Sequence, residues 1–302
     1  MKKALLYIST VLIWGSTWLA IEFQLGEVPV FVSLVYRFAI AAVVMWLYCV
    51  WAKVPMSFSR QNHMFIALLA CSNFSLNYAL IYYSQTYLSS AMTSIAFSTM
   101  LLMNIVNTRI FFGSHISIRV YVGALFGILG IVALFWDDIG AIEASVASML
   151  GLGLVLSGAL VASLGNMVSV RNSRADMNVF AVNAWGMLYG TLILIFVVFI
   201  SGNQFTISTQ PSYLISLLYL GVFGTVIAFA TYYVLLNDMG PEKASYVIVL
   251  FPVVAVVLST LFEGFRWTNN TVIGFALVLI GNAVLLTPLD KISTYLARKQ
   301  LG

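Results

Sequence analysis

The chain has 302 residues, of which 62% are hydrophobic and 8% are charged, and its net charge at pH 7 is +4. Soluble domains carry about 25% charged residues, so this composition excludes a surface that faces water on all sides. The two cysteines, Cys49 and Cys71, fall within apolar stretches and indicate neither a disulfide framework nor a metal site. The sequence therefore predicts an integral membrane protein.

Ten apolar stretches follow one another, each close to the length of about 20 residues that a helix needs to cross a bilayer. The first follows Lys2 and Lys3 and has no small-residue cleavage site, so we expect a retained helix and not a signal peptide. The expected fold is all-α, with ten transmembrane helices. The predicted spans are 4–23, 30–51, 64–83, 88–108, 118–136, 147–168, 178–200, 212–235, 243–262 and 271–288.

Basic residues alternate between the loops. Of the 14 Lys and Arg residues, Arg266 alone falls in the loops of one side, and Arg37 lies inside a span. The others lie at the termini and in the loops of the opposite side. The positive-inside rule then predicts a multi-pass protein of the cell membrane (inner or plasma membrane) with both termini in the cytoplasm. The basic net charge is thereby explained by topology, and nucleic acid is not an expected partner.

The fifth and tenth spans are similar in sequence. Gly123 aligns with Gly274 and Gly130 with Gly281, and the preceding spans end in 111–113 and 262–264 in the same register. Chance similarity between apolar helices is the alternative to a duplication. A duplication predicts one membrane domain with two five-helix repeats, 1–140 and 141–302. Because five is odd, the two repeats are inverted relative to each other, as in many secondary transporters.

Several segments resemble the EamA-like branch of the drug/metabolite transporter superfamily across essentially the whole chain. These segments are WGSTW from Trp14, Arg37-Phe38, LGVFGTVIAF from Leu220, GPEKASYVIVLFPVVAVVL from Gly240, Glu263-Gly264 and the pair Gly274 and Gly281. The resemblance implies ten helices in two repeats and the export of amino acids or other small metabolites. The first repeat departs from the pattern. Thr99 occupies the position equivalent to Pro252, and Phe112 occupies the position equivalent to Glu263.

Polar side chains inside a span are costly unless they face protein or a water-filled cavity, so they indicate inward faces. One interpretation is a central substrate cavity between the repeats. The alternative is that Ser and Thr bond their own helix, Asn joins neighbouring helices, and Tyr bonds the backbone. The cavity candidates are Trp14, Thr17, Trp18, Arg37, Asn73, Asn77, Tyr78, Ser94, Ser98, Asn166, Tyr232 and Tyr246.

Trp14 and Trp18 are spaced i, i+4 and therefore share one helix face. That face could contact lipid. The small residues Gly15, Ser16 and Thr17 beside them favour close approach of another helix, and with it an inward face.

Arg37 lies inside the second span, where a charge costs about 2.5–3.5 kcal/mol at mid-bilayer. We expect it to pair with Glu22, which lies at comparable depth in the first span. The alternatives are that its side chain extends to the interface or that it binds a substrate carboxylate. Glu22, Pro252 and Glu263 are candidates for structural or gating roles, and Glu263 is expected to make a helix-end contact.

These features favour a secondary transporter that exports or exchanges small metabolites, amino acids or related compounds, by alternating access. No phosphate-binding loop of an ATP-driven pump is present, and we expect no cofactor. The small-residue faces at Gly123, Gly127 and Gly130 and at Gly186 and Gly190 allow a homodimer contact. A membrane-embedded enzyme acting on lipid or lipid-linked substrates is the alternative function. It is disfavoured because only two histidines exist, both in loops. A scaffold is disfavoured by the short loops.

Overall fold

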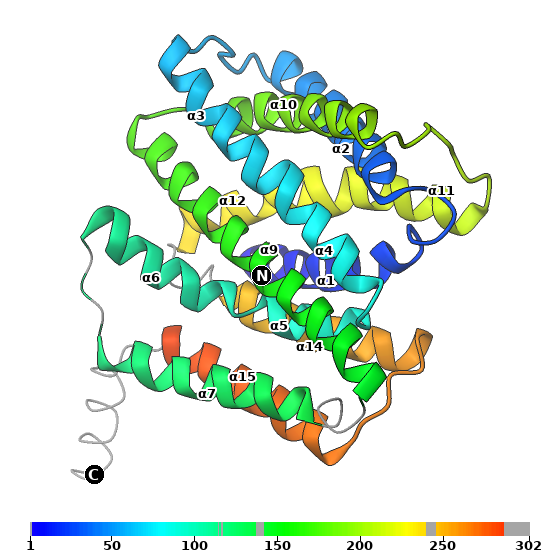
Figure 1. Ribbon diagram of the computed structural model, residues 1–302. Coiled ribbons are helices and arrows are strands. Elements are labelled where there is room, and N and C mark those ends of the chain that lie inside the picture. Colours follow the sequence, from blue (N-terminus) through cyan, green and yellow to red (C-terminus); the bar gives the residue numbers. More distant parts are fainter. Residues whose placement is uncertain (1, 114, 116, 137–141, 240–245, 287–302) are drawn as a thin grey trace.

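The computed structural model describes residues 2–113, 115, 117–136, 142–239 and 246–286, which form helices and loops without strands (Figure 1). Eight helices of this part are long and apolar enough to cross a membrane, and two shorter apolar helices, Ile118–Leu134 and Val247–Phe262, complete ten spans. The predicted all-α membrane fold is confirmed. The boundary between the predicted repeats, at 140 and 141, lies outside the described residues.

The five spans of the first half alternate in direction, and the first of them begins at the face of the molecule that holds Lys2, here called the N-terminal face; the opposite face is called the far face. They are α1 (Lys2–Glu22), α2 (Val30–Trp51), α3 (Arg60–Cys71) continued by η1 (Ser72–Leu76) and α4 (Asn77–Gln85), α5 (Ser90–Phe97) with α6 (Met100–Phe112), and α7 (Ile118–Leu134).

The second half starts from the far face, because five crossings precede it. Its spans are α9 (Ile142–Arg174), α10 (Val179–Ile200), α11 (Pro211–Leu218) continued by η2 (Tyr219–Ile227) and α12 (Ala228–Met239), α14 (Tyr246–Phe262) and α15 (Asn269–Leu286).

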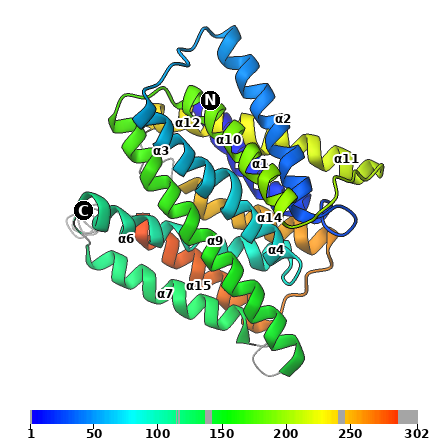
Figure 2. The ribbon, with the colours of Figure 1, turned by 45° about the horizontal axis from the view of Figure 1, so that its top comes forward.

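Packing between the spans is reciprocal. The first span packs on the ninth, and the sixth packs on the fourth; the third packs on the sixth, and the eighth on the first. The second span pairs with the seventh, and α7 pairs with α15 at one edge of the molecule (Figures 1 and 2). Exchanging the two halves reproduces every one of these pairings, as expected for two inverted copies of one five-helix unit.

The sixth span is longer than predicted. The helix α9 continues past residue 168 to Arg174 because its polar last turns contact aromatic rings. The Arg171 guanidinium lies 3.8 Å from the centroid of the Phe65 ring, and that of Arg174 lies 4.2 Å from the Phe112 ring. These cation–π contacts hold the N-terminal-face end of α9 against the third and fourth spans.

Repeat-related spans carry irregular segments in both halves. The third span contains the π-helical segment η1, and the eighth contains η2. The fourth span is interrupted between α5 and α6, where the hydroxyls of Ser98 and Thr99 donate to the carbonyls of Ile95 (2.6 Å) and Ala96 (2.7 Å). Pro252, by contrast, lies inside the continuous helix α14. The interruption therefore occurs in the copy without the proline, where hydroxyl groups compete for backbone carbonyls.

The close contact of α7 with α15 depends on glycine. A Cβ atom on Gly123 would lie 2.8 Å from the carbonyl oxygen of Gly281, and one on Gly130 would lie 2.9 Å from that of Gly274. The aligned glycines of the two repeats therefore face each other within one molecule. Gly127, on the same helix, has open space at its Cβ position.

Candidate substrate cavity

A cavity of about 460 Å³ lies between the two halves. Spans one to four and six to nine all contribute to its lining, whereas α7 and α15 do not. Nine of the predicted site residues line it. They are Trp14, Thr17, Trp18, Arg37, Asn73, Asn77, Tyr78, Asn166 and Tyr232.

The cavity runs along the membrane normal. Arg37, at its far-face end, lies about two turns inside α2. Thr108 and Val170, at its other end, lie about one turn from the N-terminal-face ends of α6 and α9. Val170 is exposed. The cavity thus approaches the N-terminal face and stops short of the far face.

Amide side chains form a chain across the cavity wall. Asn73 Nδ2 donates to Asn166 Oδ1 (3.2 Å), and Asn166 Nδ2 donates to Asn104 Oδ1 (3.2 Å). Gly165 makes this possible, because a Cβ there would overlap Asn73 Oδ1 and would lie 2.5 Å from Ser72 Oγ. The π-helical segment η1, which contains Asn73, thereby sits directly against α9 and joins the two halves through amides.

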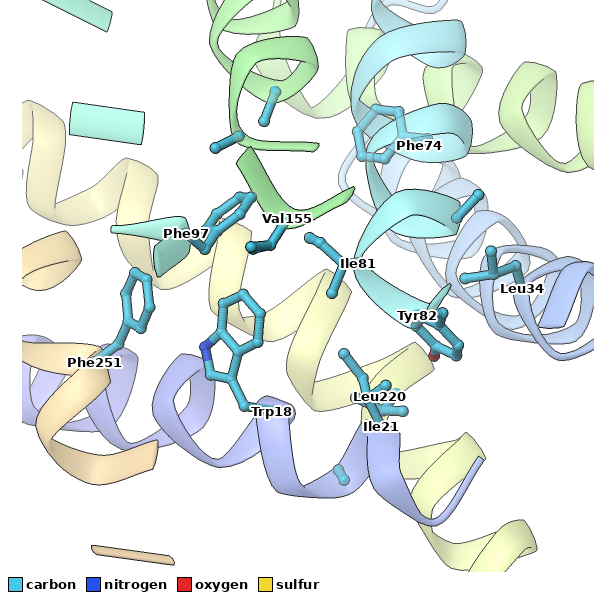
Figure 3. Packing of buried hydrophobic residues seen from close by; sticks show 14 of the residues in the cluster. Trp18, Ile21, Leu34, Phe74, Ile81, Tyr82, Phe97, Val155, Leu220 and Phe251 are labelled. Atoms are coloured by element: carbon cyan, nitrogen blue, oxygen red, sulfur yellow. The ribbon is translucent and has the colours of Figure 1, made fainter. Parts of the chain in front are cut away.

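Aromatic rings also line the cavity. Trp14 packs edge-on against Phe229 (5.7 Å between ring centroids) and lies 5.0 Å from Tyr232. Trp18 lies 5.3 Å from Phe97 and stacks at 5.7 Å on Phe251 (Figure 3). Both tryptophans face the cavity, so the lipid-facing alternative for this pair is wrong.

Arg37 is 1% exposed and contacts only neutral groups among the described residues. Its Nη1 donates to the Tyr82 hydroxyl (3.3 Å), its Nε to Thr225 Oγ1 (3.4 Å), and its Cζ lies 4.5 Å from the centroid of the Tyr78 ring. The predicted pair with Glu22 is wrong. Arg37 faces α4 and η2, whereas Glu22 lies close enough to Glu263, after α14, for their charges to repel.

Polar contacts close the far-face end. Glu263 Oε2 accepts hydrogen bonds from the backbone N–H of Ser90 (3.2 Å) and from the Ser259 hydroxyl. Glu263 thus makes a contact at the first turn of α5, the kind of helix-end contact expected from its position in sequence.

Buried amides complete this closure. Gln24 Nε2 donates to the carbonyl of Tyr213 (2.9 Å) and to the Ser216 hydroxyl, and Gln85 Nε2 donates to the carbonyl of Trp18 (3.1 Å). Because these contacts join α1 and the loop after it to α4 and α11, they hold three spans together at the far-face end of the cavity.

The remaining candidates lie elsewhere. Ser94 Oγ donates to the Ala91 carbonyl of its own helix (2.8 Å), and Ser98 accepts from Asn282 Nδ2 (2.9 Å). Neither serine lines the cavity, so the packing alternative holds for this pair. Pro252 is buried within α14, and the side chain of Tyr246 lies outside what the structure describes.

Several cavity residues were not predicted from the sequence, among them Asn183, Phe74 and Phe229. Asn183 is a single amide in an otherwise apolar stretch, which is itself a signal that could have found it. The described residues contain no group of His, Cys, Asp and Glu that could hold a metal ion.

Ten spans in two inverted halves around a shared cavity are an architecture of membrane transport proteins. The model of the EamA-like transporter family matches residues 1–136 and 149–287, so the chain belongs to the EamA-like transporter family. The protein is therefore a multi-pass membrane transporter and not an enzyme.

Relatives in bacteria are similar over nearly their whole length. The uncharacterized transporter YoaV of Bacillus subtilis is 24% identical over 281 residues, which cover 93% of this chain and 95% of YoaV. The uncharacterized inner membrane transporter YedA of Escherichia coli is 27% identical over 287 residues (92% and 90%). A solved crystal structure shares the fold, with a TM-score of 0.68 at 16% identity, covering 94% of this chain and 96% of its own.

Proposed function

We propose that this transporter exports or exchanges small metabolites, amino acids or related compounds, by alternating access. The observation that carries the proposal is the cavity of about 460 Å³, which is lined by the equivalent four spans of each half. Small-molecule sites commonly have volumes of about 300–1,000 Å³, so a single metabolite fits.

The inverted halves, 1–140 and 141–302, supply a mechanism. A movement of one half against the other closes the N-terminal-face end and opens the far end, because two inverted copies can exchange conformations. The far-face contacts of Gln24, Gln85 and Glu263 would break in that step. The substrate changes only the populations of the two states, so net flux follows its gradient or that of a coupled ion.

The orientation of the protein follows from the basic loops. With both termini in the cytoplasm, the described conformation has its cavity directed to the cytoplasm, ready to load a substrate for export. Reporter fusions test this orientation: a fluorescent protein on each terminus should fold and fluoresce, and alkaline phosphatase there should be inactive. An active phosphatase at either terminus would overturn it.

We also propose a homodimer, whose contact would use the small residues of α7. Gly123 and Gly130 are occupied by α15 within the molecule, and Gly127 is the glycine of this helix that has open space. Crosslinking through a cysteine at Gly127 in membranes tests whether two copies meet there.

The transport function is tested by reconstituting the purified protein in liposomes. A panel of amino acids and metabolites is loaded, and efflux is measured with and without a pH gradient. Saturable efflux of at least one solute is expected. Efflux at the rate of protein-free liposomes for every solute would contradict the proposal, and a dependence on the pH gradient would identify proton coupling.

A further inference from the structure

The guanidinium of Arg37 is a buried charge without a countercharge in the described part of the chain. A guanidinium has five N–H donors. Only two of them have a hydrogen-bond acceptor, the hydroxyls of Tyr82 and Thr225, and both bonds are long at 3.3 and 3.4 Å. Typical N–H···O bonds are about 2.9–3.0 Å. The second terminal nitrogen, Nη2, has no acceptor among the described side chains.

The positions of its neighbours hold Arg37 in place. Tyr82 and Thr225 are fully buried, and the Tyr78 ring lies against the guanidinium. The side chain is therefore supported from α4 and η2, and its remaining N–H donors have no acceptor among the described residues. Neutral hydroxyls and an aromatic face orient a guanidinium without neutralising it.

No other charged residue lines the cavity, which contains neither a carboxylate nor a lysine among its described lining residues. A charge in a poorly hydrated site is costly when it has no partner. A ligand that brings one negative charge removes that cost, and a ligand that brings a positive charge adds to it. The cavity thus selects by the sign of the ligand's charge.

The rest of the lining indicates what kind of uncharged moiety (here called the body of the ligand) accompanies that charge. Tyr78 lies beside Arg37, and the Trp14 and Trp18 rings follow along the same cavity. The other polar groups of the lining are neutral, among them the amides of Asn73 and Asn166, which bond each other. The walls therefore suit an apolar or aromatic body, and they offer no carboxylate to pair with a substrate ammonium group.

Resting on the transport function proposed above, we propose that the cavity is an anion site, in which Arg37 binds the carboxylate of a monoanionic compound with an apolar or aromatic body. Planar carboxylates match the two parallel N–H groups of a guanidinium. A neutral or zwitterionic analogue with the same body binds more weakly, because its ammonium group, where present, loses water without gaining a countercharge.

Three ligands that share a phenyl ring and differ in charge test this proposal. They are 3-phenylpropionate (anion), phenylalanine (zwitterion) and phenethylamine (cation). Binding to the purified full-length protein in detergent is measured by equilibrium dialysis with radiolabelled 3-phenylpropionate and by competition with the other two. A charged hydrogen bond contributes about 1.5–3 kcal/mol, so the anion should bind about tenfold to a hundredfold more tightly than the cation.

Substitutions at Arg37 separate its charge from its shape. Arg37→Gln should abolish the preference for the anion, and Arg37→Lys should keep part of it. Arg119→Gln is the matched control, because Arg119 is a partly buried arginine on α7 that does not line the cavity and donates from Nε to Ser117 Oγ. It should bind all three ligands as the parent protein does.

A second variant does not depend on the folding of Arg37→Gln. Asn77→Asp places a carboxylate in the cavity that holds Arg37, so it should weaken binding of 3-phenylpropionate and strengthen binding of phenethylamine. Equal binding of anion and cation by the parent protein would overturn the proposal, as would a preference that survives both Arg37→Gln and Asn77→Asp.

Failure of this proposal and failure of the transport function are distinguishable. Solute efflux from liposomes without any preference for carboxylates overturns the anion site and leaves the transporter. Charge-selective binding in detergent without efflux of any solute leaves the anion site and overturns the transporter.

Discussion

Glu263 accepts a hydrogen bond from the backbone N–H of Ser90, 3.2 Å away, and so links the residue that follows α14 to the first turn of α5. The two elements come from different halves of the chain, and their contact lies at the far-face end of the cavity. A carboxylate at a helix N-terminus is stabilised by the helix dipole and by the free N–H groups of the first turn.

Removal of this contact should open the far end. Glu263→Ala is expected to reduce the free energy that favours the closed far end by about 1 kcal/mol. This corresponds to a roughly fivefold increase in the population of the open state. The measurement is the rate at which an impermeant maleimide, added from the far side, labels a cysteine at Ile21, in protein whose Cys49 and Cys71 are replaced by alanine. Ile21 lines the cavity and is 3% exposed.

Glu263→Gln is the control for this experiment, because the glutamine keeps an oxygen that can accept from Ser90. Its labelling rate should stay near that of the parent. Equal rates for Glu263→Ala and the parent would show that this contact does not hold the far end closed.

Gly165 allows η1 to approach α9, and Gly165→Ala should separate them. The added Cβ overlaps Asn73 Oδ1, so the hydrogen bond from Asn73 to Asn166 is lost and substrate binding falls. Overpacking of this kind costs about 1–3 kcal/mol. Thermal unfolding in detergent and efflux from liposomes are the measurements.

Gly153→Ala, on the same helix, has no atom within 4 Å of the added Cβ and serves as the control. It should unfold at or slightly above the temperature of the parent, since alanine favours a helix over glycine. If both variants behave alike, helix propensity and not the contact with Asn73 determines the effect at Gly165.

The effect of a Gly→Ala substitution on the α7–α15 contact should likewise depend on which glycine of α7 is replaced. Gly130→Ala introduces a Cβ 2.8 Å from the backbone nitrogen of Val278 and 2.9 Å from the carbonyl oxygen of Gly274. Because backbone atoms cannot relieve the overlap by changing rotamer as a side chain can, we expect a loss of about 1–3 kcal/mol in the free energy of unfolding. Denaturant titration followed by circular dichroism measures it.

Gly127→Ala, one turn away on α7, should leave the unfolding free energy unchanged or raise it by up to about 1 kcal/mol. A loss at Gly127 equal to that at Gly130 would mean that α7 uses a face other than the one that contacts α15.

Asn282 and Ser98 form a buried hydrogen bond that ties α15 to the interrupted fourth span. Ser98→Ala leaves the Asn282 amide without this acceptor and should cost about 1 kcal/mol or more. Asn282→Leu in the same protein removes the orphaned donor and should recover part of that loss. Unfolding free energies of the two single variants and the double variant provide the cycle; strict additivity would show that the bond contributes nothing.

Depth in the membrane could be predicted from the sequence, because it follows from counting residues from a span's end. The observed α2 therefore agrees with the predicted span, and Arg37 lies about two turns inside it. Glu22, which was expected at comparable depth, is the last residue of α1. The pairing of Arg37 with Glu22 was wrong because it also depends on how each helix is rotated about its own axis, and counting residues carries no information about rotation.

Rotation could be predicted where polar or aromatic side chains repeat along one face. Asn73 with Asn77 and Trp14 with Trp18 are i, i+4 pairs, and all four residues line the cavity. Ser94 and Ser98 share this spacing and still bond within their own helix, because a hydroxyl can satisfy itself on a nearby carbonyl and an amide cannot do so fully. Asn183 is isolated in its span, so no periodic pattern pointed to it.

The interruption of the fourth span shows a further limit. Thr99 in place of a proline predicted a divergence between the repeats, but not that the helix would break where the proline is missing. The break depends on side-chain hydroxyls of Ser98 and Thr99 and on the amide that reaches Ser98 from α15. Such a contact between distant segments has no signature in local sequence.

Where Gly123 faces Gly281 and Gly130 faces Gly274, the α7 and α15 backbones lie too close together for a lipid acyl chain to pass between them. This seam joins the two halves at one edge and contributes nothing to the cavity. We therefore expect the route of a solute to be sealed against sideways leakage into the bilayer at that edge, whichever end of the molecule is open to water.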